Sequence, residues 1–215
     1  MILQSRSNLA LACGLSAIAG YVDGIGFIHL GGLFVSFMSG NSTRLGVSAA
    51  EGDWAKALHA LLLLGLFVLG AAIGTLMVQG RSRYRQAVLL LLEAALLAAA
   101  AACYPLGWPD YAIAGLVVAM GLENAVFQVG GSAGLGLTYV TGALVKVGQT
   151  LAQALDGGPR WAWLPNLLLW LALVIGSVSG AYAYHRINLD AIWIAAFAAL
   201  FMCAVFAVRT RLSRQ

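Results

Sequence analysis

Two short stretches of the chain carry the same polar pattern: residues 37–46 read FMSGNSTRLG, and residues 139–148 read YVTGALVKVG. With 102 added to the first set of numbers, the matched pairs are Phe37–Tyr139, Ser39–Thr141, Gly40–Gly142, Arg44–Lys146 and Gly46–Gly148. Each stretch sets hydroxyl groups, glycines and a basic residue into an apolar neighbourhood. The shared pattern predicts that the chain contains two related halves.

Further landmarks flank both stretches in the same order. Upstream, with one residue of slip, Gly20-Tyr21-Val22-Asp23 aligns with Gly121-Leu122-Glu123-Asn124. Downstream, EGDW (51–54) corresponds to DGGPRW (156–161), and the basic linker at 81–85 corresponds to His185-Arg186. Glycine is abundant in this chain, so the order of the landmarks carries more weight than any single match. The sequence predicts one domain over 1–215, with repeats at about 9–103 and 110–208.

The composition excludes a water-soluble fold. Hydrophobic residues make up 61% of the chain and charged residues only 9%, with a mean hydropathy of +0.89. Soluble domains carry about 25% charged residues. An integral membrane protein is therefore expected. The net charge of +4 is interpreted as a topology signal, and no nucleic-acid partner is expected.

Six stretches approach the roughly 20 apolar residues that a membrane-spanning helix needs. They are 9–29, 57–79, 87–103, 110–128, 163–184 and 190–208. Two more, 30–50 and 130–155, are rich in Gly, Ser and Thr, and each contains a basic residue. The predicted fold class is an all-α membrane protein with six transmembrane helices and two Gly-broken half-helix or re-entrant segments.

Basic residues decide between six and eight spans. Arginines cluster at 81–85 and again at 209–214, and Arg6 lies near the N-terminus. Such residues favour the cytoplasmic side of a membrane. Six spans place all three groups on that side and the link at 104–110 outside, whereas eight spans separate the two clusters. We therefore expect a multi-pass protein of the bacterial plasma membrane, with both termini cytoplasmic.

Three spans per half invert the second half relative to the first. Inverted repeats recur in secondary transporters, whose binding sites lie at paired interrupted segments near the membrane midplane. The predicted substrate-binding residues are Ser39, Gly40, Asn41, Thr43, Arg44, Thr141, Gly142 and Lys146. A basic side chain at the bilayer centre costs about 2.5–3.5 kcal/mol. Two matched basic residues therefore favour a shared anionic ligand, although snorkelling of Arg44 and Lys146 to the interface is the alternative.

Acidic residues within the spans are candidates for coupling. Asp23 lies late in the first span and Glu123 at the matching place in the fourth, with Asn124 beside it. Intramembrane carboxylates face a cavity or the bundle interior. The alternative role for them is a structural tie between helices. Glu93, in LLLLEAALLAAA, is interpreted as structural, through pairing with the 81–85 cluster, with a role in the pore as the alternative.

The stretch GYVDGIGFIHLGGLFVSFMSGNSTRLG (20–46), together with the TGALVKVG echo, resembles the YoaK family of bacterial inner-membrane proteins. The resemblance extends over essentially the whole chain. It implies a six-span protein of the bacterial plasma membrane, and it implies no substrate and no functional residues.

The predicted function is a small secondary transporter for a small, preferably anionic, solute, with proton coupling as an option. Two rival functions are a passive channel and a non-transporting assembly or sensor protein, and a cation substrate stays open. No enzyme motif occurs, and no cofactor or metal site is expected, since the three cysteines form no CxxC pair. The expected partners are the solute and the bilayer, and a homodimer is an open alternative.

Overall fold

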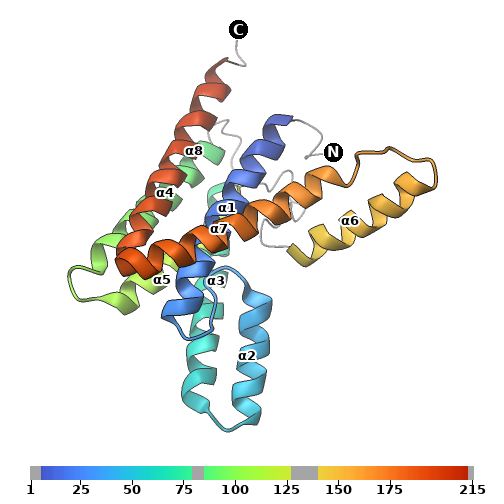
Figure 1. Cartoon of the computed structure of the whole chain (residues 1–215). Helices are drawn as coiled ribbons and strands as arrows, with labels where there is room; N and C mark the ends of the chain where they lie inside the picture. The colour runs from blue at the N-terminus through green and yellow to red at the C-terminus, as the bar shows by residue number, and fades with distance from the viewer. Residues whose placement is uncertain (1–5, 79–84, 127–139, 213–215) are drawn as a thin grey trace.

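The computed structural model describes residues 6–78, 85–126 and 140–212, which form helices and turns without a β-strand (Figure 1). The elements are α1 (Arg6–His29), α2 (Met38–Ala50), α3 (Trp54–Val78), α4 (Arg85–Cys103), α5 (Pro109–Glu123), α6 (Val140–Leu155), α7 (Leu164–Ile187), the 3₁₀ helix η2 (Asn188–Ala191) and α8 (Ile192–Leu212). The prediction of an all-α fold is confirmed for these residues. Tyr139, the predicted counterpart of Phe37, lies outside them.

Four stretches of the described residues are long and apolar enough to cross a membrane: Leu9–His29, Trp54–Met77, Gln86–Cys103 and Leu164–Val208. The last stretch contains both α7 and α8. The chain turns between them at η2. Asn188 opens that turn with a φ of 52° and a ψ of −140°. Its Oδ1 accepts a hydrogen bond from the Leu189 amide (2.8 Å). Length and hydropathy thus agree with a membrane protein.

Helices α1, α4, α5 and α8 supply most of the buried core, while α3 and α7 lie beside it. Fully buried residues of the four central helices include Leu15, Leu90, Leu116, Met120 and Ile192. The outer surfaces of α3 and α7 expose large apolar side chains such as Leu58, Leu69, Ile175 and Val178. Contiguous exposed apolar surface marks contact with a partner or a membrane. In a membrane protein, these surfaces face lipid.

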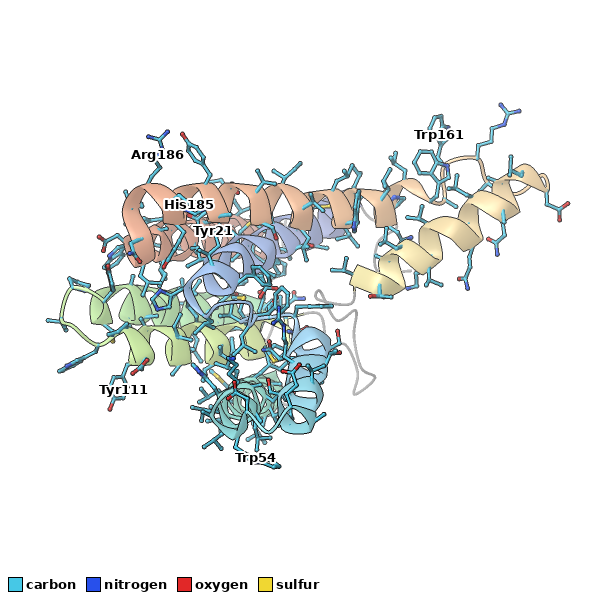
Figure 2. All side chains as sticks on the ribbon, turned by 60° about the horizontal axis from the view of Figure 1, so that its bottom comes forward. Tyr21, Trp54, Tyr111, Trp161, His185 and Arg186 are labelled. Carbon is cyan, nitrogen blue, oxygen red and sulfur yellow. The ribbon has the colours of Figure 1, made fainter. Side chains whose placement is uncertain are left out.

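Hydrogen bonds between helices fix the direction of α1 relative to α7. Ser16 Oγ donates to the Leu169 carbonyl (3.0 Å), and further along both helices Ser177 Oγ donates to the Gly20 carbonyl (3.0 Å). The residue numbers rise together along both helices, so α1 and α7 are parallel. Trp161, which precedes α7, and Arg186, near its end, lie at opposite ends of the molecule (Figure 2).

The remaining central helices alternate in direction. Cys203, late in α8, donates to the carbonyl of Ala87 at the start of α4, and Gln86 donates to the carbonyl of Val126 just after α5. Tyr21 of α1 donates to the carbonyl of Ala191, immediately before α8. Therefore α4 is antiparallel to α5 and α8, and α1 is antiparallel to α8. The starts of α1, α4 and α7 and the ends of α5 and α8 lie at one face.

Two helix pairs approach so closely that only glycine fits between their backbones. In the pair α1–α7, a methyl group on glycine would collide with a backbone carbonyl oxygen at four positions: Gly20 (with Leu173), Gly24 (with Ser177), Gly176 (with Ala17) and Gly180 (with Tyr21). In the pair α5–α3, the same applies at Gly121 (with Phe67), Gly70 (with Val118) and Gly74 (with Leu122). Small residues allow this kind of backbone approach between membrane helices.

Three of the four contacts of α1–α7 map onto the three contacts of α5–α3, whereas Gly24 corresponds to Ala125. Adding 101 converts the α1 residues into the α5 residues, and adding 106 converts the α3 residues into the α7 residues. For example, the contact of Gly20 with Leu173 becomes the contact of Gly121 with Phe67. The two pairs therefore share one packing register, although different parts of the sequence build them.

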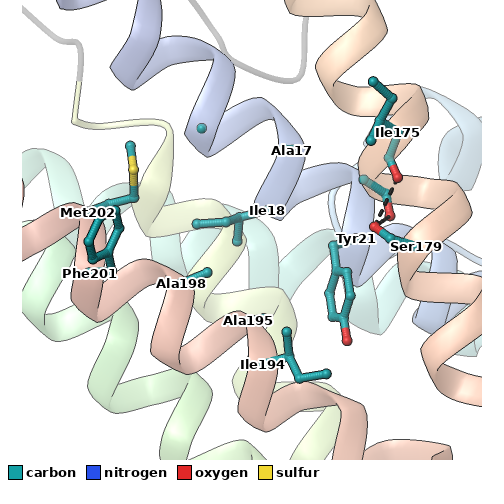
Figure 3. Close-up of a pocket in the computed structure, with 12 residues that line it drawn as sticks. Ala17, Ile18, Tyr21, Ile175, Ser179, Ile194, Ala195, Ala198, Phe201 and Met202 are labelled. Carbon is teal, nitrogen blue, oxygen red and sulfur yellow. Dashed lines mark hydrogen bonds between the residues drawn. The ribbon is translucent and has the colours of Figure 1, made fainter.

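The contact of α1 with α8 differs from the contact of α5 with α4, although the shifts of 101 and 106 residues make these two contacts equivalent in sequence. A crevice of about 270 Å³ separates parts of α1, α7 and α8, and Figure 3 shows Ile18, Ala198 and Met202 among its lining residues. The atoms nearest to a methyl group on Gly14 belong to the side chain of Met202. On the other side, α4 packs closely along α5, and a methyl group on Gly115, the counterpart of Gly14, would lie 3.1 Å from Ala100 Cβ.

Candidate functional site

Asp23 of α1 holds the loop that leads into α2. Its Oδ1 accepts hydrogen bonds from the backbone amides of Val35 (2.9 Å) and Ser36 (2.7 Å), and its Oδ2 accepts one from Ser36 Oγ (2.5 Å). The Asp23 side chain is buried. A carboxylate that accepts several hydrogen bonds fixes the donors around it. Asp23, predicted as a coupling residue, therefore positions the segment in front of the first polar helix.

Asn41 holds the same loop from the side of α2. Its Oδ1 accepts from the Phe34 amide (2.8 Å) and its Nδ2 donates to the Phe34 carbonyl (2.7 Å), so one side chain satisfies both backbone groups of one residue. Asn41 is fully buried. Buried backbone groups need such partners because leaving them unpaired is costly. Both polar groups of Asn41, predicted to bind substrate, are thus occupied by the loop.

Gly40 supports this arrangement because it leaves room for aromatic rings. The Phe34 ring packs against Phe27 (5.0 Å between centroids) and Phe37 (5.1 Å). A methyl group on Gly40 would lie 2.9 Å from the Phe34 ring and closer still to Phe37. The glycine in the S-G-N-S-T-R stretch therefore serves the packing of the loop onto the start of α2, which begins at Met38.

The other predicted residues of α2 are exposed. Ser39 is exposed, and the Thr43 hydroxyl donates to its carbonyl within the helix (3.1 Å). The Arg44 guanidinium lies against the backbone of Gly32, where a methyl group would be 2.7 Å from Nη2. Among the described residues, the ion pair found joins Lys56 Nζ and Asp53 Oδ2 (2.7 Å), and its hydrogen bond lowers the pKa of Asp53. Arg44 has no carboxylate partner within that part of the chain.

The second polar helix, α6, has no buried residue and packs against α7. Thr141 and Lys146 are exposed, and Thr150 donates to the Lys146 carbonyl (2.6 Å). Helix α2 packs against α3 instead. In Figure 1 the N-terminal ends of α2 and α6 face the middle of the molecule, and their C-terminal ends point outward. The structure does not bring Arg44 and Lys146 into contact.

A group of buried carboxyl groups lies among the central helices. Glu93 of α4 and Glu123 of α5 are 0% and 1% exposed. Both oxygens of Glu93 and Oε1 of Glu123 have no hydrogen-bond partner among the described residues. The charges of Glu93 and Asp23 reach Glu123. Asn124, next in the chain, donates to the Met120 carbonyl (2.9 Å).

The sequence predicts that Glu93 is structural and pairs with the 81–85 cluster. Residues 81–84 and the side chain of Arg85 lie outside the described residues, so this pairing stays a prediction. Among the described residues Glu93 has no ion pair, and its charge acts on Glu123 of the neighbouring helix α5. The sequence marks Glu93 as unusual, because it is a lone acidic residue within a run of Leu and Ala. Thirty residues separate Glu93 from Glu123, and sequence spacing does not report contact between two different helices.

Comparison with known proteins then places the chain. A family described as "Protein of unknown function (DUF1275)" matches residues 11–205. The chain belongs to this family. Among DUF1275 relatives, the UPF0700 transmembrane protein RA0705 of Rhizobium meliloti (strain 1021) is 38% identical over 201 residues, which cover 94% of this chain and 87% of that protein. The UPF0700 transmembrane protein YoaK of Bacillus subtilis (strain 168) is 31% identical over 155 residues, covering 68% and 67%.

These relatives confirm the resemblance to the YoaK family and agree with the helical architecture of a transmembrane protein. No solved structure matches the chain.

Proposed function

We propose that this protein is a small secondary transporter that carries a small anionic solute across the bacterial plasma membrane. In this proposal, six helices (α1, α3, α4, α5, α7 and α8) span the membrane as two inverted repeats of three. The short polar helices α2 and α6 are inserted after the first helix of each repeat. Both termini are cytoplasmic, as the positions of the basic residues favour.

The main support for this proposal is the packing register that the helix pairs α1–α7 and α5–α3 share. Three backbone contacts correspond at constant shifts of 101 and 106 residues, and these shifts pair the first and second helices of one repeat with those of the other. The helix directions support an inverted relation, because α1 is antiparallel to α8, α8 to α4, and α4 to α5. It follows that α1 and α5 run in opposite directions. Inverted repeats of this kind recur in secondary transporters.

The polar helices supply the proposed solute site. Their N-terminal ends face the middle of the molecule (Figure 1), and free N–H groups at a helix start favour an anion. Arg44 and Lys146 occupy matching positions, and Arg44 has no carboxylate partner among the described residues. Ser39, Gly40, Thr43, Thr141 and Gly142 lie within the first two turns of their helices. Asp23 and Asn41 act by holding the loop before α2.

Alternating access would come from the contacts that differ between the repeats. The α1–α8 crevice is open in this structure, while its counterpart between α5 and α4 is closed. Exchanging these two arrangements would open the opposite face of the protein around a fixed site. The crevice lining is mostly apolar, so the crevice is the space that α8 closes and not the path of the solute.

A thermal-shift screen of the purified protein against small anions and cations across pH tests the proposal. A ligand that binds the native state stabilises it in proportion to ln(1 + [L]/Kd). An anion is expected to raise the Tm, and Arg44→Gln and Lys146→Gln should each weaken its binding about tenfold or more, because a hydrogen bond to a charged group contributes about 1.5–3 kcal/mol. Their effects should be non-additive, since both contact one ligand.

Lys56→Gln is the matched control, because it removes an exposed positive charge that already has an acidic partner. It should leave the anion response unchanged. Additive effects near zero for Arg44→Gln and Lys146→Gln, or stabilisation by cations alone, would contradict an anion site shared by the two helices.

A further inference from the structure

The buried carboxyl groups of Glu93 and Glu123 lie on α4 and α5, two helices that pack against each other in the core, and the charge of Glu93 acts on Glu123. Both helices contribute fully buried apolar residues around them, including Leu90 and Leu97 of α4 and Leu116 and Met120 of α5. No described residue donates a hydrogen bond to either oxygen of Glu93 or to Oε1 of Glu123. Two acidic side chains therefore lie in the buried core with three carboxyl oxygens that no described residue satisfies.

No described side chain supplies a positive charge that forms an ion pair with Glu93 or Glu123. Asp23 of α1, whose charge reaches Glu123, is itself acidic and is engaged with Val35 and Ser36. The remaining titratable side chains described on the packed elements are Cys13, Tyr21 and His29 of α1, Cys203 of α8, the exposed Asp190 of η2, Lys56 and His59 at the start of α3, and Cys103, Asp110 and Tyr111 at the far ends of α4 and α5. Tyr21 and Cys203 donate to backbone carbonyls, and His29 forms a hydrogen bond with Tyr184.

Burying a carboxylate without a donor or counter-charge is very unfavourable, and two neighbouring carboxylates repel each other. We propose that Glu93 and Glu123 together form a proton-binding site in the middle of the membrane. One proton adds to a carboxylate oxygen of either residue and is shared with the other, which changes the charge of the pair from −2 to −1. Intramembrane acids arranged in this way serve as proton relays in pumps and transporters.

The position of the pair connects proton binding to the movement of the repeats. Glu93 and Glu123 lie on α4 and α5, whose contact is closed in this structure and would open when the repeats exchange conformations. Their counterparts in the other half, at shifts of 106 and 101, are Ala199 and Val22, both apolar and fully buried. Only one of the two alternating contacts therefore carries a proton site. This coupling role rests on the proposed transport function.

Infrared spectroscopy of the purified protein in phosphatidylcholine vesicles tests the site, with the proton itself as the probe. At neutral pH the wild type is expected to show the carbonyl band of a buried protonated carboxyl group, which disappears as the pH is raised. Glu93→Gln and Glu123→Gln should each remove or shift this band, while Glu51→Gln, at an exposed position, should leave it unchanged. Glu93→Asp, which keeps a carboxyl group, should shift the band without abolishing it.

Persistence of the band in a Glu93→Gln/Glu123→Gln double variant would overturn the assignment, and so would the absence of the band at neutral pH in the wild type. Loss of the band on adding sodium at constant pH would identify a cation site instead and would also overturn it. The readout needs no solute. If no anion stabilises the protein but the band behaves as expected, the transport proposal fails and the proton site stands.

Discussion

The contact of α1 with α7 and the contact of α1 with α8 show two different ways in which one helix can meet its neighbours. Against α7, the glycines of α1 meet backbone carbonyls directly, and the same register recurs where α5 meets α3. Against α8, the nearest atoms to Gly14 are those of the flexible Met202 side chain, whereas the equivalent Gly115 of α5 packs against Ala100 of α4. The first contact is the same in both halves of the chain, and the second is not.

This difference separates a rigid part of the molecule from a movable one. Backbone atoms in close contact have no freedom to adjust, because protein interiors are packed to near crystal density. A methionine side chain has three rotatable bonds and adapts to irregular space. We therefore interpret α1–α7 and α5–α3 as rigid units, and α1–α8 and α5–α4 as contacts that change when the solute crosses.

Substitution of the contact glycines should have the largest effect on stability. Gly176→Val and Gly70→Val would each drive a side chain into a backbone carbonyl, of Ala17 and Val118 respectively. Overpacking of this kind costs about 1–3 kcal/mol, and more where the backbone cannot shift. Both variants should lower the midpoint of thermal unfolding in detergent by similar amounts, because the two contacts are equivalent.

Gly65→Val is the control, since no atom of another residue lies within 4 Å of a methyl group at that helical position. It should unfold close to the wild-type temperature. If Gly176→Val destabilises the protein and Gly70→Val behaves like Gly65→Val, the two helix pairs are not equivalent and the comparison between the halves breaks down.

Substitution of Asn41 should have a smaller effect on stability, confined to the first repeat. Asn41→Leu keeps the approximate volume of the side chain but leaves the buried amide and carbonyl of Phe34 without partners. An unsatisfied buried group costs about 1–3 kcal/mol. We expect lower thermal stability and faster hydrogen exchange at the Phe34 amide. Ser42→Ala removes an exposed hydroxyl bonded within its own helix and should change little. Equal effects of the two substitutions would show that the loop is not held as described.

Composition and periodicity were sufficient to predict the class of fold and the approximate place of each long helix. The repeat also located the short polar helices, since α2 begins at Met38 and α6 is described from Val140, again 102 residues apart. These features depend on local sequence, which reports whether a segment is apolar and where its pattern is interrupted.

Tertiary relations were not predictable in this way. The role of Asn41 depends on the loop that brings Phe34, seven residues earlier, next to its side chain. The effect of Glu93 on Glu123 depends on how α4 packs against α5. The sequence predicts a shift of 102 residues for the polar stretches and, with one residue of slip, 101 for the end of the first span. The structure adds a shift of 106 for α3, because the connections around the polar helices differ in length.

The central claim is that the two repeats alternate between an open and a closed contact, and disulfide trapping tests it most directly. With Cys13, Cys103 and Cys203 replaced by serine, Gly115→Cys/Ala100→Cys places a thiol pair at the closed α5–α4 contact. Gly14→Cys/Phe206→Cys is the equivalent pair between α1 and α8. The Cβ separation of 3.1 Å between Gly115 and Ala100 is close to the roughly 3.5–4.5 Å that a disulfide requires.

In membranes, each pair alone should form a disulfide, and each disulfide should abolish stabilisation by the anion until it is reduced. In a variant carrying all four cysteines, any one molecule should contain one disulfide or the other and never both. Molecules that contain both disulfides, or a Gly14→Cys/Phe206→Cys pair that never forms one under any condition, would contradict the exchange of conformations between the repeats.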